Sequence, residues 1–374
     1  MDTNLERLME SLSLPDRMLR IAEKVIRGSR IDEQEALHLF DSSNLPFLGV
    51  LAVISKRRQS GDFVYFNKNF HLEPTNICIN HCKFCSFRRD KGQKGAWECT
   101  VEEMIGQVEK AVPSGVTEVH IVGGVHPERD VVFYSGLLRE IKKTAPSLHI
   151  KAFTAVEIDQ MCRMAGLEVR EGLIMLREAG LDSLPGGGAE IFDEVLRAEI
   201  SPDKTSSKEW LNIHRIAHRL NIPTNATMLY GLKESHQHRI DHMTRLRDLQ
   251  DETHGFNCFI PLKFKRKNNQ YSSRHELPVV EELRNYAVAR IYLDNIPHLK
   301  AYWPMTGKLV AQISLNFGVD DLDGTVDDST KIYSMAGSDE QNPSATTQEL
   351  IHLIKQAKFV PAQRDTLYHI IETY

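Results

Sequence analysis

The segment Cys78-Ile79-Asn80-His81-Cys82-Lys83-Phe84-Cys85 brings three thiols into one short stretch of chain. Thiolates are soft ligands, and thiolates clustered in this way select iron–sulfur clusters, zinc or copper(I). A four-iron cluster has four corners, whereas this segment offers only Cys78, Cys82 and Cys85 as ligands. The spacing therefore predicts a [4Fe–4S] cluster with one iron left open to a ligand that is not protein.

Two other metal sites stay open for this segment. A structural zinc would need a fourth ligand, and although His71 or His81 could serve, the spacing fits no common zinc finger. An electron-transfer ferredoxin would need a fourth cysteine in the pattern. The remaining cysteines, Cys99, Cys162 and Cys258, stand alone and are expected to be small buried residues. An iron–sulfur electron carrier is thus the alternative from a different class of protein.

The composition excludes several classes of function. The chain has 374 residues, of which 41% are hydrophobic and 26% charged, as in ordinary globular proteins. Its net charge of −5 gives no basic field for nucleic acid. The longest apolar run, Phe47–Ile54, is far shorter than the ~20 residues that span a bilayer. The first residues, Met1–Glu6, lack the basic and apolar regions of a signal peptide. We expect neither a nucleic-acid nor a membrane partner, and a cytoplasmic location.

Short β-rich runs alternate with amphipathic helical stretches between residues 66 and 325. A capping box at Thr100 begins one of these helices, and Gly180 ends another. Such alternation predicts βαβ units and a parallel sheet, either doubly wound or curled into a barrel. We expect a helical N-terminal extension over residues 1–65 and a C-terminal helical segment over residues 326–374 that packs on the catalytic domain. The predicted strands are Val116–Val122, His149–Thr154, Asp182–Leu184, Thr224–Leu229, Asn257–Leu262 and His298–Trp303.

The triplet, with aromatic Phe84 before its last cysteine, resembles the signature of the radical S-adenosylmethionine (radical SAM) superfamily. The resemblance implies an α/β fold, a TIM-type β/α barrel that is partial or complete with helical additions at both ends. It also implies that the open iron of the [4Fe–4S] cluster chelates the methionine end of S-adenosylmethionine. Gly123-Gly124 resembles the glycine pair that receives the methionine amino group, where small residues let a ligand approach the main chain. The implied cofactor-binding residues are Phe84, Gly123, Gly124, Thr154, Glu190, Asn225 and Ile260.

Further segments narrow the resemblance within the superfamily. Asn76–Cys78, Pro185–Ile191 and Leu249–Thr253 look like enzymes that act on futalosine-pathway and deazaflavin intermediates. Thr224–Gly231 and Phe259–Phe264 resemble the aminofutalosine synthases. Two departures from that pattern are Leu232, where His is expected, and His254, where Gly is expected.

The resemblance implies a specific reaction in menaquinone biosynthesis. The 5′-deoxyadenosyl radical adds to 3-[(1-carboxyvinyl)oxy]benzoate and gives 6-amino-6-deoxyfutalosine, methionine and bicarbonate, so that S-adenosylmethionine is consumed. Two carboxylates need cations or donors, and the ring needs an apolar slot. The substrate-binding candidates at strand ends are His126, Thr227, Tyr230 and Lys263, and His126 is also the catalytic candidate because imidazole titrates near neutrality. A flavodoxin- or ferredoxin-type reductant and a homodimer are the expected protein partners. The alternative in the same class is a dehypoxanthine futalosine cyclase or another related radical SAM enzyme.

Overall fold

The computed structural model describes residues 15–42 and 44–374, so the sequence predictions for Met1–Glu6 lie outside the described residues. The described chain begins with three helices, α2 (Asp16–Arg27), α3 (Glu33–Ser42) and α4 (Leu45–Ser60). Gly28 ends α2 in the left-handed conformation, and the Asn44 side chain accepts a hydrogen bond from Phe47 N at the start of α4. These helices pack against the side of the molecule through α11 (His236–Thr253) and α12 (Val279–Tyr292).

Parallel strands form the centre of the molecule. In the first sheet β1 (Phe63–Leu72) pairs with β2 (Glu118–Ile121), and β2 pairs with β3 (His149–Ala152). A second sheet runs in the order β4 (Thr224–Tyr230), β5 (Phe256–Lys263) and β6 (His298–Leu299).

Single bridges join the two sheets into a ring. Ser183 bridges to Lys151 of β3, and Leu184 bridges to Thr224 of β4, so the predicted strand Asp182–Leu184 is present only as these bridges. On the other side β7 (Asp321–Val326) pairs with β1, and Asp321 bridges to Lys300 just after β6. The backbone pairing thus continues around a complete parallel barrel, as the barrel alternative required.

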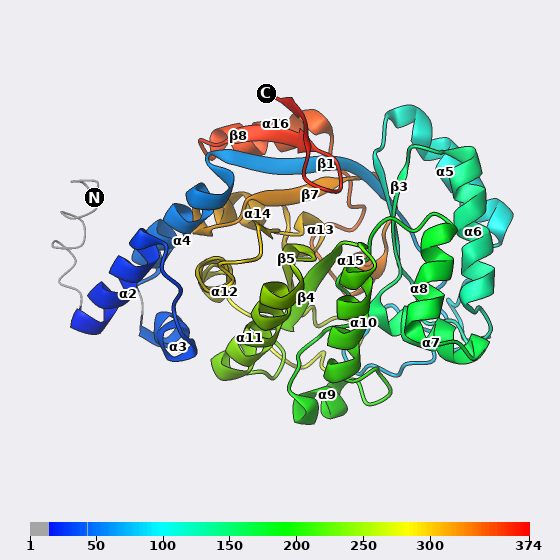
Figure 1. Cartoon of the computed structure of the whole chain (residues 1–374), viewed down its shortest axis with the longest axis horizontal. Helices are drawn as coiled ribbons and strands as arrows, with labels where there is room; N and C mark the ends of the chain where they lie inside the picture. The colour runs from blue at the N-terminus through cyan, green and yellow to red at the C-terminus, as the bar shows by residue number, and fades with distance from the viewer. Residues whose placement is uncertain (1–14, 43) are drawn as a thin grey trace.

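The helices that follow the strands surround this barrel (Figure 1). The Thr100 capping box is confirmed, because its side chain accepts from Glu103 N while the Glu103 carboxylate accepts from Thr100 N. No helix among residues 15–42 and 44–374 is long and apolar enough to cross a membrane. The surrounding helices are α5 (Val101–Ala111), α6 (Val131–Thr144), α7 (Ala155–Ala165), α8 (Val169–Glu178), α9 (Glu194–Ile200), α10 (Ser207–Arg219), α11 and α12, with α13 (Trp303–Thr306) and α14 (Lys308–Ser314) after β6.

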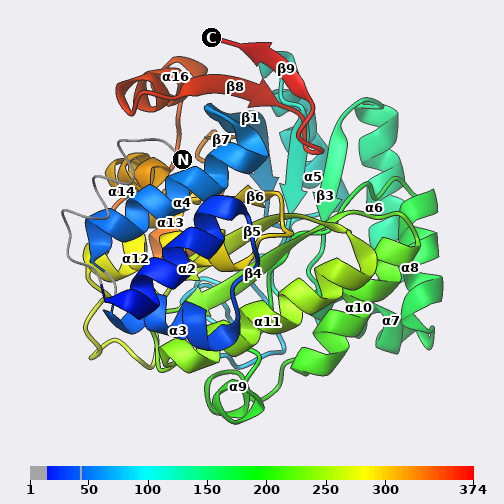
Figure 2. The same ribbon diagram turned by 60° about the vertical axis from the view of Figure 1, so that its left-hand side comes forward.

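The C-terminal region differs from the helical segment predicted for residues 326–374. It contains α15 (Ile332–Met335) and α16 (Thr347–Gln356), but also strands β8 (Val360–Arg364) and β9 (Ile370–Thr373). The first half of β1 pairs with β8, and the second half pairs with β2 on the same edge (Figure 2). A proline in β8 argues against a strand when the sequence is considered alone, and the free edge of β1 supplies the pairing. The predicted boundaries after residues 65 and 325 fall inside β1 and β7.

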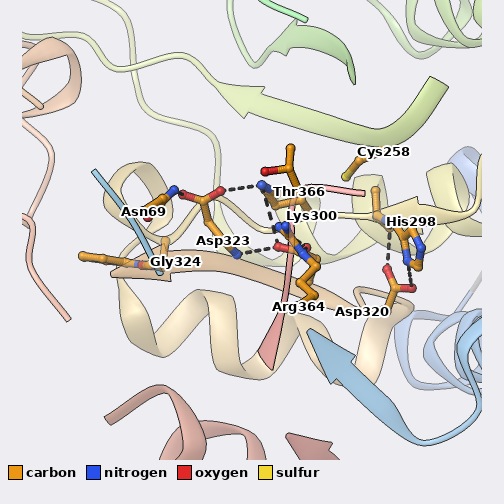
Figure 3. Close-up of polar contacts among 12 residues, drawn as sticks. Asn69, Cys258, His298, Lys300, Asp320, Asp323, Gly324, Arg364 and Thr366 are labelled. Atoms are coloured by element: carbon orange, nitrogen blue, oxygen red, sulfur yellow. Dashed lines mark hydrogen bonds and ion pairs between the residues drawn. The ribbon is translucent and has the colours of Figure 1, made fainter. Parts of the chain in front are cut away.

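The loop after β8 closes the base of the barrel with polar contacts. Arg364 Nε donates to Asp321 Oδ2 at 2.6 Å, and Thr366 Oγ1 donates to Glu118 Oε2 at 2.7 Å (Figure 3). Arg364, Asp321 and Glu118 are all buried. The C-terminal segment therefore supplies the charge that balances the acidic residues inside the barrel.

Candidate active site

The cysteine loop follows β1 at the carboxyl end of the barrel. Buried Asn76 ties its two ends together, because its side-chain amide donates to Gly95 O at 2.9 Å and accepts from Trp97 N at 2.8 Å. Cys78 N donates to Arg89 O at 3.1 Å, and Cys85 N donates to Cys82 O at 3.1 Å. The loop is thus fixed by its own backbone, with the three cysteines on its inner part.

The three thiols lie near enough to one another to interact electrostatically. Burial raises the pKa of Cys82 to about 12, and the other two thiols add to this effect while Lys204 opposes it. Burial also raises the pKa of Cys78. Thiols such as Cys78 and Cys82, whose pKa is raised, need a cationic centre to become thiolates, which is what an iron–sulfur cluster provides. The residues therefore fit the predicted cluster.

The zinc alternative has no support from the two candidate histidines. The exposed ring of His81 contacts Asp203 Oδ2 at 3.1 Å, and the ring of His71 lies inside the barrel against His120. In the described residues no group of three or more His, Cys, Asp or Glu side chains is arranged to hold a single metal ion. A fourth protein ligand for zinc is therefore not placed at this loop.

The glycine pair lets β2 pass directly against the cysteine loop. Gly124 N donates to Thr75 O at 2.7 Å, and a Cβ atom on Gly124 would lie 2.2 Å from Ile77 O. At Gly123 a Cβ atom would lie 2.8 Å from Thr75 O. The sequence analysis explained Gly123 and Gly124 by the close approach of a ligand. In the structure it is the backbone of the cysteine loop that lies close to these two residues. Within the described residues no donor bonds to the carbonyl oxygens of Gly123 and Gly124, which leaves them as acceptors for an amino group.

A cavity of about 290 Å³ opens beside the cysteine loop. Its wall joins the ends of strands from both sheets and is mainly apolar. Nine of the predicted site residues line it, namely Phe84, Cys85, Gly123, Thr154, Glu190, Asn225, Thr227, Ile260 and Lys263. The structure thus brings these residues together around one cavity. The two that are farthest apart in the sequence, Phe84 and Lys263, are separated by 179 positions.

The loop Gly186–Gly188 forms one wall of the cavity and is held from behind. Buried Arg197 donates to Gly188 O at 2.9 Å, and Thr227 Oγ1 donates to Gly186 O at 2.5 Å. A Cβ atom on Gly186 would lie 2.6 Å from Asn225 O. Thr227 therefore positions the glycine loop, as well as lining the cavity.

An ion pair between Lys204 and Glu190 stands at the cluster end of this wall. The Lys204 ammonium lies 5.5 Å from the centre of the Phe84 ring. Burial opposes the charge of Lys204, but Cys82 and Glu190 together raise its pKa above the ordinary value. Lys204, which the sequence analysis missed, thus connects a cluster cysteine to the predicted cofactor residue Glu190.

His126 does not line the cavity, contrary to its predicted catalytic and substrate-binding roles. Glu128 N donates to its Nδ1 at 3.0 Å, so the hydrogen resides on Nε2, which lies 2.9 Å from Glu98 Oε2. Burial is the main reason that its pKa is lowered. The chain turns after Val125, and the ring faces a separate small hollow with Arg129. The sequence located this residue near the glycine pair but could not give its direction.

Two other substrate-binding candidates also have different surroundings from those expected. Tyr230 is fully buried outside the cavity wall, with the Arg239 guanidinium 5.3 Å from its ring centre. Lys263 lines the cavity, but its ammonium is already paired with buried Glu282. Of the cluster cysteines, Cys85 reaches the cavity wall, while Cys78 and Cys82 lie behind it.

Deeper polar side chains of the barrel were missed by the sequence analysis. They line the inner end of the cavity, and we call them the polar floor: His71, His120, Lys151, Lys300, Tyr302 and Asp323. Their signal in the sequence is the alternation of polar and apolar residues in β1, β2 and β3. Alternation of this kind normally indicates a strand with one face in solvent, whereas here the polar face points into the barrel.

Comparison with known proteins agrees with this architecture. Residues 72–246 match the radical SAM superfamily, and residues 253–374 match the CofH/MqnC C-terminal region. The chain is similar in fold to methylornithine synthase (TM-score 0.73, 17% identity, 91% of this chain and 97% of that one). It is also similar to the FeFe-hydrogenase maturase of Carboxydothermus hydrogenoformans (TM-score 0.74, 16% identity, 94% of this chain and 80% of that one).

Curated relatives match almost the whole chain. An aminodeoxyfutalosine synthase of Thermus thermophilus is 44% identical over 96% of this chain and 97% of its own length. An aminodeoxyfutalosine synthase of Streptomyces coelicolor is 38% identical over 100% of this chain and 96% of its own length. The chain belongs to the radical SAM superfamily, in the group that carries the CofH/MqnC C-terminal region. It is therefore a radical SAM enzyme, and its family implies a [4Fe–4S] cluster and S-adenosylmethionine.

Proposed function

We propose that this enzyme is an aminodeoxyfutalosine synthase of the futalosine route to menaquinone. It would join the adenosyl part of S-adenosylmethionine to 3-[(1-carboxyvinyl)oxy]benzoate, releasing methionine and bicarbonate. The observation that carries the proposal is the 44% identity, over nearly the full length of both chains, to a relative of that name. The cavity that adjoins Cys85 supports it, because that space reaches from the cluster loop to cationic side chains.

In this proposal Cys78, Cys82 and Cys85 would hold the cluster, which when bound would supply the electron for cleavage of the S–C5′ bond of S-adenosylmethionine. The Gly123 carbonyl oxygen, at the cavity wall, would accept the methionine amino group, and Gly124 would let the chain pass close to the cysteine loop. The adenosyl part occupies the space that is lined by Phe84, Thr154, Glu190, Asn225 and Ile260. Gly124 does not line this space. Phe84 and Ile260 supply apolar surface, and the three polar side chains orient the ribose.

The wall of the same cavity offers apolar surface to the aromatic ring of the substrate. Leu229, Leu262 and Phe264 lie there beside the substrate-binding candidates Thr227 and Lys263. Enclosure by these side chains keeps water away from the carbon-centred radical. We propose a flavodoxin- or ferredoxin-type protein as the source of the electron. The homodimer remains a prediction.

Relatives with other names define the alternative. A cyclic dehypoxanthine futalosine synthase of Streptomyces coelicolor is 36% identical over 94% of this chain and 88% of its own length. Its lower identity does not favour the cyclase as the function of this chain. An electron carrier would not need the enclosed cavity that the cysteine loop adjoins.

Separate anaerobic incubations with each of two candidate substrates test the proposal. The reconstituted enzyme is given S-adenosylmethionine, dithionite and either the enolpyruvyl benzoate or dehypoxanthine futalosine. Mass spectrometry should find an adenosine-containing adduct and methionine with the first substrate, and the second should return unchanged. Cyclisation of dehypoxanthine futalosine, with no adduct from the benzoate, would assign the chain to the cyclase instead.

A further inference from the structure

Three side chains of the polar floor stand in one layer of the barrel. Backbone pairing puts His71 of β1 opposite His120 of β2, and His120 opposite Lys151 of β3. Paired residues of parallel strands point to the same face, which here is the barrel interior. The two imidazole rings are 4.6 Å apart between centres and are inclined by 36°.

Three ring nitrogens of the two imidazoles have no hydrogen-bond partner in the described part of the chain. His71 is buried, and neither of its ring nitrogens has a hydrogen-bond partner, nor does Nε2 of His120. By contrast, Lys151 Nζ lies 2.7 Å from Glu118 Oε1, and Lys300 pairs with Asp323. A buried polar atom without a partner costs about 1–3 kcal/mol, so such atoms call for an explanation. Both imidazoles line the cavity, which makes a ligand the natural partner.

The ionised groups around the pair are already matched with one another. The cations Lys151, Lys300 and Arg364 face the acids Glu118, Asp321 and Asp323, so the ionised groups of the floor balance. Burial lowers the pKa of His71 to about 4 and that of His120 well below its ordinary value, so both rings are neutral at pH 7. A neutral imidazole always carries one N–H. His71, which lines the cavity, therefore has an unpaired donor whichever nitrogen bears the hydrogen.

We propose that His71 and His120 bind the carboxylate on the aromatic ring of the substrate. This inference rests on the proposed function and adds the subsite that recognises the benzoate end. A carboxylate has lone pairs for both imidazole donors and is attracted by the ammonium groups of Lys151 and Lys300. The two histidines lie within β1 and β2, whereas the cysteine loop and Gly123 follow the ends of these strands. The floor is thus the deeper end of the cavity, and it suits the carboxylate farther from the reacting vinyl group.

This arrangement makes the site selective for charge at one position of the ligand. An analogue in which the ring carboxylate is replaced by a carboxamide keeps the size of the substrate but loses the negative charge and one of the two acceptor oxygens. A site built to hydrogen-bond a ligand group rejects analogues that leave its buried polar groups unpaired by factors of up to roughly 10⁴–10⁵. Because the amide keeps one acceptor and can donate to an imidazole nitrogen, we expect it to bind about 100-fold more weakly than the acid, which is below that limit.

Equilibrium binding without reductant measures this preference in the absence of turnover. Calorimetry on the cluster-loaded full chain with S-adenosylmethionine compares 3-[(1-carboxyvinyl)oxy]benzoate with 3-[(1-carboxyvinyl)oxy]benzamide. His71→Phe and His120→Phe should each reduce the preference at least tenfold, while His71→Gln, which restores a donor, should keep more of it. The control His214→Phe also changes a buried imidazole with an unpartnered nitrogen, but one outside the cavity, and should leave the preference unchanged.

The outcomes separate this inference from the proposed function. Wild-type enzyme that forms the adduct but shows no preference for the acid would overturn the carboxylate subsite and leave the function intact. Folded His71 and His120 variants with the wild-type preference would do the same. If the enzyme forms no adduct but still prefers the acid, and this preference depends on His71, the carboxylate subsite is supported and the proposed reaction is contradicted. Because the acid–amide comparison on wild-type enzyme needs no substitution, an unstable variant does not remove the test.

Discussion

Glu157 Oε1 accepts a hydrogen bond from Gly123 N at 3.2 Å, while its Oε2 accepts from Thr154 N at 2.7 Å. One buried carboxylate therefore joins the end of β2 to the start of α7 after β3. Both of its partners are residues that we assign to cofactor binding. Its position makes Glu157 a positioning residue for the cofactor side of the cavity.

The ionisation of Glu157 should affect stability. Burial raises its pKa from 4.5 to about 7, against the stabilising effect of its hydrogen bonds. A raised carboxyl pKa gives stability that is present below pH 4.5 and is lost as the pH rises through about 7. The full shift corresponds to about 3 kcal/mol. Between pH 5 and pH 8, the free energy of unfolding measured in urea should therefore fall more for wild type than for Glu157→Gln. An equal fall in the two proteins would contradict the raised pKa of Glu157.

Gly124→Ala should displace the cysteine loop. The new methyl group would meet Ile77 O, just before Cys78, at 2.2 Å, and a backbone atom cannot move aside cheaply. We expect iron and acid-labile sulfide per chain to fall severalfold after reconstitution. Gly106→Ala is the control, because a Cβ atom at that position in α5 has no neighbour within 4 Å. Equal iron content in both variants would show that the close approach is not needed.

Asp320 should be essential for stability. Its carboxylate accepts from Arg290 Nη2 at 2.6 Å and from Leu299 N at 2.7 Å. It also contacts His298 Nδ1 at 2.9 Å (Figure 3). Despite burial, these contacts lower its pKa to about 2, so their contribution is present above pH 3.8 and is lost as the pH falls through about 2. Asp320→Asn leaves the Arg290 charge without its partner and should cost about 3–5 kcal/mol in urea unfolding.

The matched control for Asp320 is an exposed ion pair. Arg30 Nη1 lies 2.6 Å from Asp251 Oδ2, with both side chains more than a third exposed. Because water screens such a pair, Asp251→Asn should cost about 1 kcal/mol or less. Similar losses for the two variants would mean that burial of the Asp320 pair contributes little.

Electron paramagnetic resonance should distinguish an open iron from a fully ligated cluster. The spectrum of the reduced enzyme should change when S-adenosylmethionine is added, because its amino acid end binds the iron. Methylthioadenosine, which lacks that end, should leave the spectrum unchanged. A spectrum that S-adenosylmethionine does not alter would indicate an electron carrier.

The common loop of the three cysteines and much of the cavity wall could be predicted because local spacing carries that information. The triplet needs only one loop, and Thr154 and Lys263 lie just after or at the carboxyl ends of β3 and β5, which meet in any parallel barrel. The direction of a side chain beyond a strand end is not local information, which is why the sequence could not show that His126 lines a separate small hollow and not the cavity. The strand β8 depends on a partner edge about 300 positions earlier, at Phe63 of β1.

The polar floor shows a second limit of sequence reasoning. Asn69 and His71 alternate with Phe70 and Leu72 at the end of β1, and the same period favours a strand at the surface. Only closure of the barrel shows that this polar face is buried and that Asp323 and Lys300 come from strands far along the chain to meet it. Long-range pairing therefore decides the substrate end of the cavity.

The most direct test of the central claim follows the adenosyl carbon atoms. The enzyme is incubated anaerobically with reductant, 3-[(1-carboxyvinyl)oxy]benzoate and S-adenosylmethionine labelled with ¹³C in its adenosyl part. The account predicts that the label appears in 6-amino-6-deoxyfutalosine, with one methionine released for each molecule of product. Label found only in 5′-deoxyadenosine, with no adenosine-containing adduct, would contradict it.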